Sequence, residues 1–144
     1  MALSADGRTA LIGAPNWGTG GAVWVFTRTR GTWSRTARLG PRDRAGSGNF
    51  GASVALSADG TTAVVGAPLD DRNAGAAYVF TRSDATWRQR GVKLTGRDEV
   101  VEDDGMFGAR LALSSDGATA LVGGIGAGLQ DAPGAVWTFR RASR

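Results

Sequence analysis

The stretch Ala55-Leu56-Ser57-Ala58-Asp59-Gly60 decides the fold, because close copies of it occur at two other places in the chain. One copy runs from Ala2 to Gly7 and the other from Ala112 to Gly117, so the pattern returns about every 55 residues. Repetition at a spacing of this order is typical of proteins built from stacked copies of one structural unit. The sequence therefore predicts a repeat architecture.

A second block repeats in the same order along the chain. Gly21–Arg28 reads GAVWVFTR, Gly75–Arg82 reads GAAYVFTR and Gly134–Arg141 reads GAVWTFRR. Trp33 and Trp87 mark a third shared position, between these blocks. Together the matches predict one repeat array over residues 1–144, with repeats at about 1–49, 50–106 and 107–144, the last of them incomplete.

Within a repeat the pattern is that of short strands, with no helix expected. Val54–Ser57 is apolar, and Asp59-Gly60 supplies the positive-φ turn of a hairpin into Thr62–Ala67. Ala76–Arg82 alternates in side-chain size as a strand does, and Trp87–Leu94 is predicted as a fourth strand. The fold class that follows is all-β, with about three four-stranded antiparallel blades of a β-propeller.

Composition excludes several kinds of protein. The chain has no cysteine and no histidine, so disulfides, thiolate metal sites and a Ser-His-Asp relay are absent. No run approaches the roughly 20 apolar residues of a membrane helix, and Met1–Asp6 does not resemble a signal peptide. The net charge of +4 comes from arginines scattered among acids, which favours a solvated surface over a nucleic-acid site.

Further residues carry a family resemblance. Phe50-Gly51 followed by Gly66-Ala67-Pro68 resembles the FG-GAP signature of integrin α-subunit propellers and of many bacterial repeat proteins. Gly13-Ala14-Pro15 belongs to the first copy, and Phe107-Gly108 opens the third, where Gly123-Gly124-Ile125 replaces Gly-Ala-Pro. The resemblance implies a propeller fold and a parent protein that is secreted or on the cell surface.

The resemblance also implies that some blades hold calcium in a loop of the form Asp-x-Asp-x-Asp-Gly. The corresponding loop here is Leu69–Gly75, whose weak candidate ligands are Asp70, Asp71 and Asn73. The spacing differs from the family's loop, and Arg72 places a cation in the middle. Calcium needs 6–8 oxygen ligands. We therefore expect no metal and no other cofactor, with calcium as the alternative.

The densest acidic stretch is Asp98–Asp104, which could contribute to a metal site or a carboxylate pair of the kind that glycosidases use. Its counterpart in the first copy, Arg42–Ser47, has lost most of the acids. A solvated loop is the favoured interpretation, and we predict no catalytic residues.

The aromatic residues fall into two groups. Tyr78 and Phe80 recur as Trp137 and Phe139, and equivalent positions in successive blades predict a buried core between them. The candidates for ligand contact are outside this core. Trp17 lies in a loop and has no counterpart, whereas Trp33 and Trp87 lie on the predicted outermost strand.

Two classes of function follow from these observations. The first is a non-enzymatic module that serves as a scaffold for adhesion or for binding protein or carbohydrate, and the alternative is a metal-assisted hydrolase that uses the acidic loops. Propellers have about 4–8 blades, so roughly three cannot close a ring. We expect a homodimer of two chains joined head to tail in a six-bladed ring, the rival being that the chain is part of a longer propeller.

Overall fold

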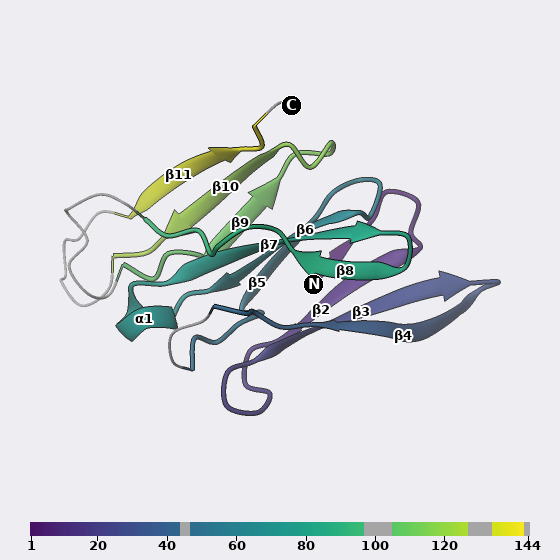
Figure 1. Ribbon diagram of the computed structural model, residues 1–144, viewed down its shortest axis with the longest axis horizontal. Helices are drawn as coiled ribbons and strands as arrows, with labels where there is room; N and C mark the ends of the chain where they lie inside the picture. Colours follow the sequence, from purple (N-terminus) through teal and green to yellow (C-terminus); the bar gives the residue numbers. More distant parts are fainter. Residues whose placement is uncertain (44–46, 97–104, 127–133, 143–144) are drawn as a thin grey trace.

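The computed structural model describes residues 1–43, 47–96, 105–126 and 134–142. Its strands form three antiparallel sheets, each built from neighbours in sequence (Figure 1). The first sheet holds β1 (Ala2–Leu3), β2 (Thr9–Ala14), β3 (Ala22–Thr29) and β4 (Thr32–Leu39). The second holds β5 (Ser53–Leu56), β6 (Thr62–Ala67), β7 (Ala76–Ser83) and β8 (Thr86–Gln89), and the third holds β9 (Arg110–Leu113), β10 (Thr119–Gly124) and β11 (Ala135–Arg140).

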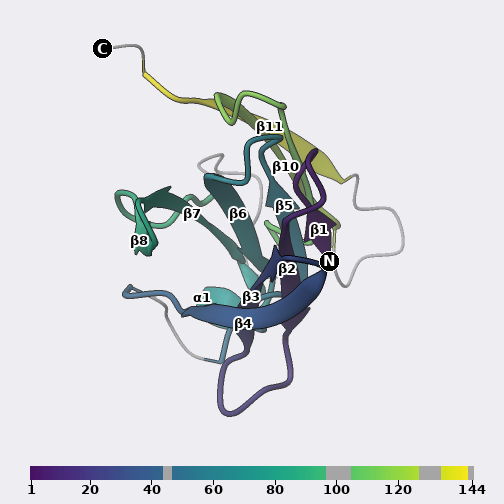
Figure 2. The ribbon, with the colours of Figure 1, turned by 90° about the vertical axis from the view of Figure 1, so that its right-hand side faces the viewer.

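The three sheets are propeller-like blades, and we call them blades 1, 2 and 3. The first strand of blade 2, β5, contacts β1 and β2 of blade 1 on one side and β9 of blade 3 on the other. Figure 2 shows the sheets fanning apart toward their later strands. The prediction of an all-β fold with antiparallel blades is confirmed, and blade 3 has three strands within the described ranges. The exact repeat limits stay a prediction.

The Asp-Gly turns are hairpins, as predicted. Gly7, Gly60 and Gly117 all have positive φ, near +67° in the third turn. In blade 2 the hydroxyl of Ser57 donates to Asp59 Oδ1 at 2.6 Å and accepts from the N–H of Thr62 at 2.9 Å. The same contacts recur in the other two turns. Serine and aspartate thus satisfy the backbone of each turn from within.

The core has two layers, because the side chains of each central strand alternate between the two neighbouring blades. Between blades 1 and 2 lie Leu11, Val23, Val25, Leu39, Phe50, Ala63, Val65, Ala67, Ala76, Tyr78 and Phe80. Between blades 2 and 3 lie Val64, Ala77, Phe107, Ala120 and Val122. Among the described residues, blade 2 is therefore covered on both faces, whereas blades 1 and 3 are each covered on one.

The Phe-Gly pair explains why glycine is needed where blades meet. The N–H of Phe50 donates to the carbonyl of Gly20 in blade 1, while its ring packs against Tyr78 and Phe80 of blade 2. A Cβ on Gly13 would collide with the backbone carbonyl of Gly51, so only glycine allows this approach. The third blade repeats the arrangement through Phe107-Gly108 and Gly66.

Three expectations are corrected by the structure. The loop after Pro68 contains a single-turn helix, α1 (Asp70–Asn73), where no helix was expected. Asp71 and Arg72 inside it have φ of +47° and +54°, so the turn is irregular. The predicted strand Trp87–Leu94 ends at Gln89, because Gly91 adopts a positive φ, and Leu94 returns only as an isolated bridge to Ala77.

The third correction concerns the aromatic core. Tyr78 and Phe80 are buried as predicted, but Trp137 and Phe139 are only half-buried. Both belong to β11, which is an edge strand of blade 3 in the described part of the chain. No further strand flanks them there, so one side of each ring stays open to solvent.

Candidate functional site

An aromatic–arginine cluster lies on the uncovered face of blade 1, and it consists of Trp17, Trp24, Arg35 and Arg38. The rings of Trp17 and Trp24 meet edge to face, with centroids 5.4 Å apart. The guanidinium carbon of Arg38 lies 4.6 Å from the ring centroid of Trp17 and 6.0 Å from that of Trp24. The guanidinium carbon of Arg35 lies 4.7 Å from the ring centroid of Trp24. Both arginines are within cation–π range of an indole.

Strand pairing explains why these side chains converge. Trp24 on β3 lies opposite Arg38 on β4, and an irregularity after Val25 brings Arg35 opposite Phe26. Trp17 reaches them from the loop after β2, where its N–H donates to Ala14 and its carbonyl accepts from Gly21. The loop is thus hydrogen-bonded at both ends, yet 46% of the Trp17 surface stays exposed.

The other two candidate tryptophans have different surroundings. Trp33 on β4 is 43% exposed, and no ring contact joins it to Trp17 among the described residues. Trp87 is half-buried, packs against the core between blades 1 and 2, and has Arg82 5.7 Å from its ring. The structure therefore gives Trp87 a packing role and leaves Trp33 on an open face.

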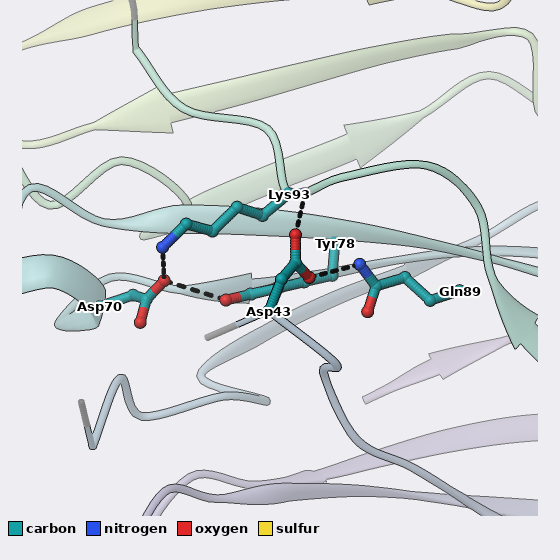
Figure 3. A network of polar contacts seen from close by, with 5 residues as sticks. All are labelled: Asp43, Asp70, Tyr78, Gln89 and Lys93. Carbon is teal, nitrogen blue, oxygen red and sulfur yellow. Dashed lines mark hydrogen bonds and ion pairs between the residues drawn. The ribbon is translucent and has the colours of Figure 1, made fainter. Parts of the chain in front are cut away.

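The candidate calcium loop contains a buried ion pair. Asp70 is fully buried, and its Oδ2 accepts from Lys93 Nζ at 2.6 Å and from the Tyr78 hydroxyl at 2.9 Å (Figure 3). Asp71 is exposed and Asn73 half-buried, both with positive φ. Within the described ranges, no three acidic side chains gather closely enough to hold a metal ion. The ammonium of Lys93 supplies the positive charge beside Asp70.

A second polar contact set adjoins this pair, although no sequence pattern predicts it. Asp43 accepts from Gln89 Nε2 at 2.6 Å and from the Lys93 N–H at 2.8 Å (Figure 3). Burial alone would raise the pKa of Asp43, but these hydrogen bonds outweigh it and hold the pKa below its ordinary value. The side chain of Gln89 also accepts from the N–H of Arg42. These contacts fasten the segment that joins blades 1 and 2.

The acidic stretch Asp98–Asp104 was the candidate for a hydrolytic site. Residues 97–104 lie outside the described part of the chain. Among the described residues, no helix has the length and apolar character that a membrane span requires.

Comparisons with known proteins agree with this arrangement. Residues 33–80 match the model of the FG-GAP repeat, a segment that contains Phe50-Gly51 and Gly66-Ala67-Pro68. Integrin alpha-2 of Mus musculus is 29% identical over 90 residues, which cover 56% of this chain and 8% of the integrin.

A solved structure, TolB from Acinetobacter baumannii, superposes with a TM-score of 0.51 at 11% sequence identity. The match covers 96% of this chain and 28% of that protein, and it bears on the fold alone. The chain thus spans only a small part of both proteins. The matched segment, the glycines that bring the blades together and the recurrence of their pattern lead to one conclusion: residues 33–80 form an FG-GAP repeat, and the chain around them is similar to FG-GAP repeat proteins.

Proposed function

We propose that this chain is a non-enzymatic binding module, a rigid scaffold that holds a protein or carbohydrate ligand. The observation that carries the proposal is the exposed aromatic–arginine cluster on blade 1. Tryptophan and arginine dominate binding energy at protein interfaces, and an indole offers a flat apolar surface beside a polar N–H. Both properties suit a ligand with apolar and polar faces.

The chemistry of the cluster favours binding over catalysis. Indole rings do not titrate, and guanidinium groups stay charged at all working pH values. General acid–base catalysis needs a group that exchanges a proton near neutral pH. The cluster can therefore stack against a ligand and donate hydrogen bonds to it, without providing a proton relay.

The cluster is also held in place before any ligand arrives. Trp17 packs edge to face on Trp24, and Arg38 lies over the Trp17 ring. Fixing side chains in advance reduces the entropy lost on binding. This supports a role for Trp17 as the main contact.

A glycan array and a pull-down, each run with the wild-type chain, Trp17→Ala and Trp33→Ala, test the proposal. We expect a ligand whose affinity falls about tenfold or more in Trp17→Ala. Trp33→Ala removes an equally exposed indole from another part of blade 1 and is expected to keep the affinity. Equal losses in both variants would contradict the assignment. Turnover of a glycoside that disappears in Asp103→Asn would refute the non-enzymatic role.

As a rival use of the open face of blade 1, we propose that two chains associate head to tail and close a six-bladed ring, which would cover Trp24. Val136 on the uncovered face of blade 3 is 69% exposed, although its counterpart Ala77 in blade 2 is fully buried. On the uncovered face of blade 1, Trp24 stands at the repeat position of Tyr78, which is buried against the preceding blade. The two open faces are thus equivalent, by repeat position, to the two faces that meet between blades 1 and 2.

Sedimentation of the wild-type chain and of Val136→Glu tests the ring. We expect a wild-type dimer and a monomeric variant, because a carboxylate in an apolar interface is costly to desolvate. A wild-type monomer of 14.8 kDa would exclude the ring and leave further blades of a longer chain as the partner. Ligand binding by Val136→Glu separates the two proposals. Ring closure would cover Trp24, whereas a monomeric variant leaves Trp24 accessible to a ligand.

We further infer that the parent protein works outside the cell or at its surface. The support is the similarity to an integrin, a likeness that covers 56% of this chain.

A further inference from the structure

An open groove of about 760 Å³ lies at the opposite end of the strands from Trp17. It runs along the β3–β4 hairpin of blade 1 and the Asp-Gly turns of blades 1 and 2; the hairpin tip is at the right of Figure 1. The charged side chains that line it are Arg8, Arg28, Arg30, Arg82, Asp6 and Asp59. The four arginine charges exceed the two carboxylate charges by two, so the groove is cationic.

The repeat places arginines along this groove. Arg28 and Arg82 occupy the same position in blades 1 and 2, directly after the repeated Val-Phe-Thr. The backbone N–H of Arg28 donates to the carbonyl of Arg8 at 2.8 Å, and that of Arg82 donates to Thr61 at 2.8 Å. Each backbone is therefore fixed beside an Asp-Gly turn, and neighbouring blades present their arginines to the same groove.

The arginine head groups are available to a ligand. Within the described parts of the chain, the guanidinium groups of Arg8, Arg28 and Arg30 make no hydrogen bond and no ion pair. Arg82 lies over the Trp87 ring, a contact that uses the face of the guanidinium and leaves its N–H edge to other partners. A guanidinium edge matches the two oxygens of a carboxylate or a sulfate.

The two carboxylates are engaged in their own turns. Asp6 Oδ1 accepts from the Ser4 hydroxyl at 2.6 Å and from the Arg8 N–H at 2.9 Å. Asp59 Oδ1 accepts from Ser57 in the same way, and its Oδ2 accepts from Thr61. The second oxygen of Asp6 accepts no hydrogen bond from a described residue, so it can accept one from a ligand hydroxyl. Thr27 and Thr29 add hydroxyl groups to the lining.

We infer that this groove binds an acidic polysaccharide, a sugar chain that carries carboxylate or sulfate groups. The arginines bind the anionic groups, while Asp6 and the threonines bind sugar hydroxyls. A nucleic acid fits less well, because no aromatic side chain from the described ranges lines the groove to stack on bases and two carboxylates would face the phosphates. The site is separate from the Trp17 cluster and stands whether or not that cluster binds a ligand.

Binding of dextran, carboxymethyl dextran and dextran sulfate, measured by calorimetry at about 0.15 M salt, tests the inference. The three polymers share one sugar backbone and differ in charged groups. We expect both anionic polymers to bind and neutral dextran not to bind. In Arg28→Gln/Arg30→Gln the affinity for the anionic polymers should fall about tenfold or more, because each arginine donates charge-assisted hydrogen bonds.

The matched control is Arg88→Gln/Arg90→Gln, which removes the same charge from exposed positions outside the groove. We expect it to bind like the wild type. Equal losses in the two arginine pairs would reduce the effect to net charge and overturn the site. Tighter binding of oligothymidylate than of either anionic dextran would assign the groove to nucleic acid instead, and no binding of any polymer would also overturn the inference.

Discussion

Two interfaces join the blades, one between blades 1 and 2 and one between blades 2 and 3. Both are made from the same repeat positions, yet equivalent residues are buried to different degrees. In each, the ring of a Phe-Gly pair meets two aromatic rings of the same blade edge to face. Tyr78 and Phe80 are 0% and 3% exposed. Their equivalents Trp137 and Phe139 are half-buried. Sequence equivalence therefore does not guarantee equal burial.

The difference lies in the strands around the rings. β4 pairs with β3 over its full length and delivers Leu39 to the core, whereas β8 ends at Gln89. Beyond that end an apolar cavity of about 380 Å³ opens between blades 2 and 3, lined in part by Val92, Leu94 and Phe139. A blade interface is tight where a long fourth strand covers it and loose where that strand stops.

The largest expected contrast is between Gly66→Ala and Gly123→Ala, which change the same repeat position. A Cβ on Gly66 would collide with the backbone carbonyl of Gly108, so we expect a loss of more than about 4 kcal/mol or no folded protein. A Cβ on Gly123 would lie 3.4 Å from the Arg110 Cβ, an ordinary contact, so the loss should stay below about 1 kcal/mol. Urea unfolding followed by circular dichroism measures both, and similar losses would contradict the steric account.

The next effect concerns the polar contacts that accompany the first interface. Lys93→Met removes the ammonium beside the buried Asp70 carboxylate. Removing one partner of a buried ion pair lowers the free energy of unfolding. We expect a loss of about 3 kcal/mol, the low end of the usual range, because the Lys93 side chain is partly exposed. Lys93→Arg keeps the charge and should lose much less. Chemical denaturation decides the matter: a Lys93→Met variant as stable as the wild type would show that the pair stabilises nothing.

A smaller contrast is expected between the aromatic rings of the two interfaces. Phe80→Ala should cost about 3–5 kcal/mol, as for a fully buried ring. Phe139→Ala should cost about 1–2 kcal/mol, because part of its surface is already in water. Thermal and urea unfolding of the two variants measures the difference. If both cost the same, the second interface is as tight as the first.

The smallest effect belongs to a feature that the blades share. Hydrogen bonds from Ser4, Ser57 and Ser114 lower the pKa values of the aspartates in the three turns, Asp6, Asp59 and Asp116. A lowered pKa means that the folded state binds protons more weakly than the unfolded chain. Stability is therefore highest above the ordinary range of aspartate and falls as the pH drops below about 4.

Urea midpoints between neutral pH and acid test this dependence. Asp59→Asn and Asp116→Asn should each reduce the acid sensitivity, and Asp59→Asn by more, since Asp59 also accepts a hydrogen bond from the Thr61 hydroxyl. A urea midpoint that does not change on acidification would contradict the expected contribution of these aspartates to stability.

The repeat made most of the fold predictable. The Asp-Gly turns, the limits of β6 and the burial of Tyr78 follow from local patterns that recur in register. The early end of β8 did not follow, because the positive φ of Gly91 has no signature distinct from that of any other glycine. The exposure of Trp137 depends on which strands flank β11, and a repeat position does not specify its neighbours.

The candidate sites were predictable only in part. Trp17 was a candidate because it has no counterpart in the other repeats, and in the structure its ring contacts Trp24 and Arg38. The pairing of Lys93 with Asp70 joins residues far apart in sequence, and the one available signal was that Lys93 is the sole lysine. The groove lined by Arg8, Arg28, Arg30 and Arg82 was not predicted, because these arginines look scattered along the chain and only blade packing brings them together.

The Phe-Gly pair also gives the array a direction of growth. Phe50 forms a parallel bridge with Gly21 of blade 1, and both residues precede in sequence the strands that cover the Phe50 ring, β6 and β7. A finished blade thus acts as the template that seats the anchor of the next, so a nascent chain can assemble its blades one at a time from the N-terminal end. Blade 2 gains from neighbours on both sides, so opening begins at the outer blades and reaches the middle last.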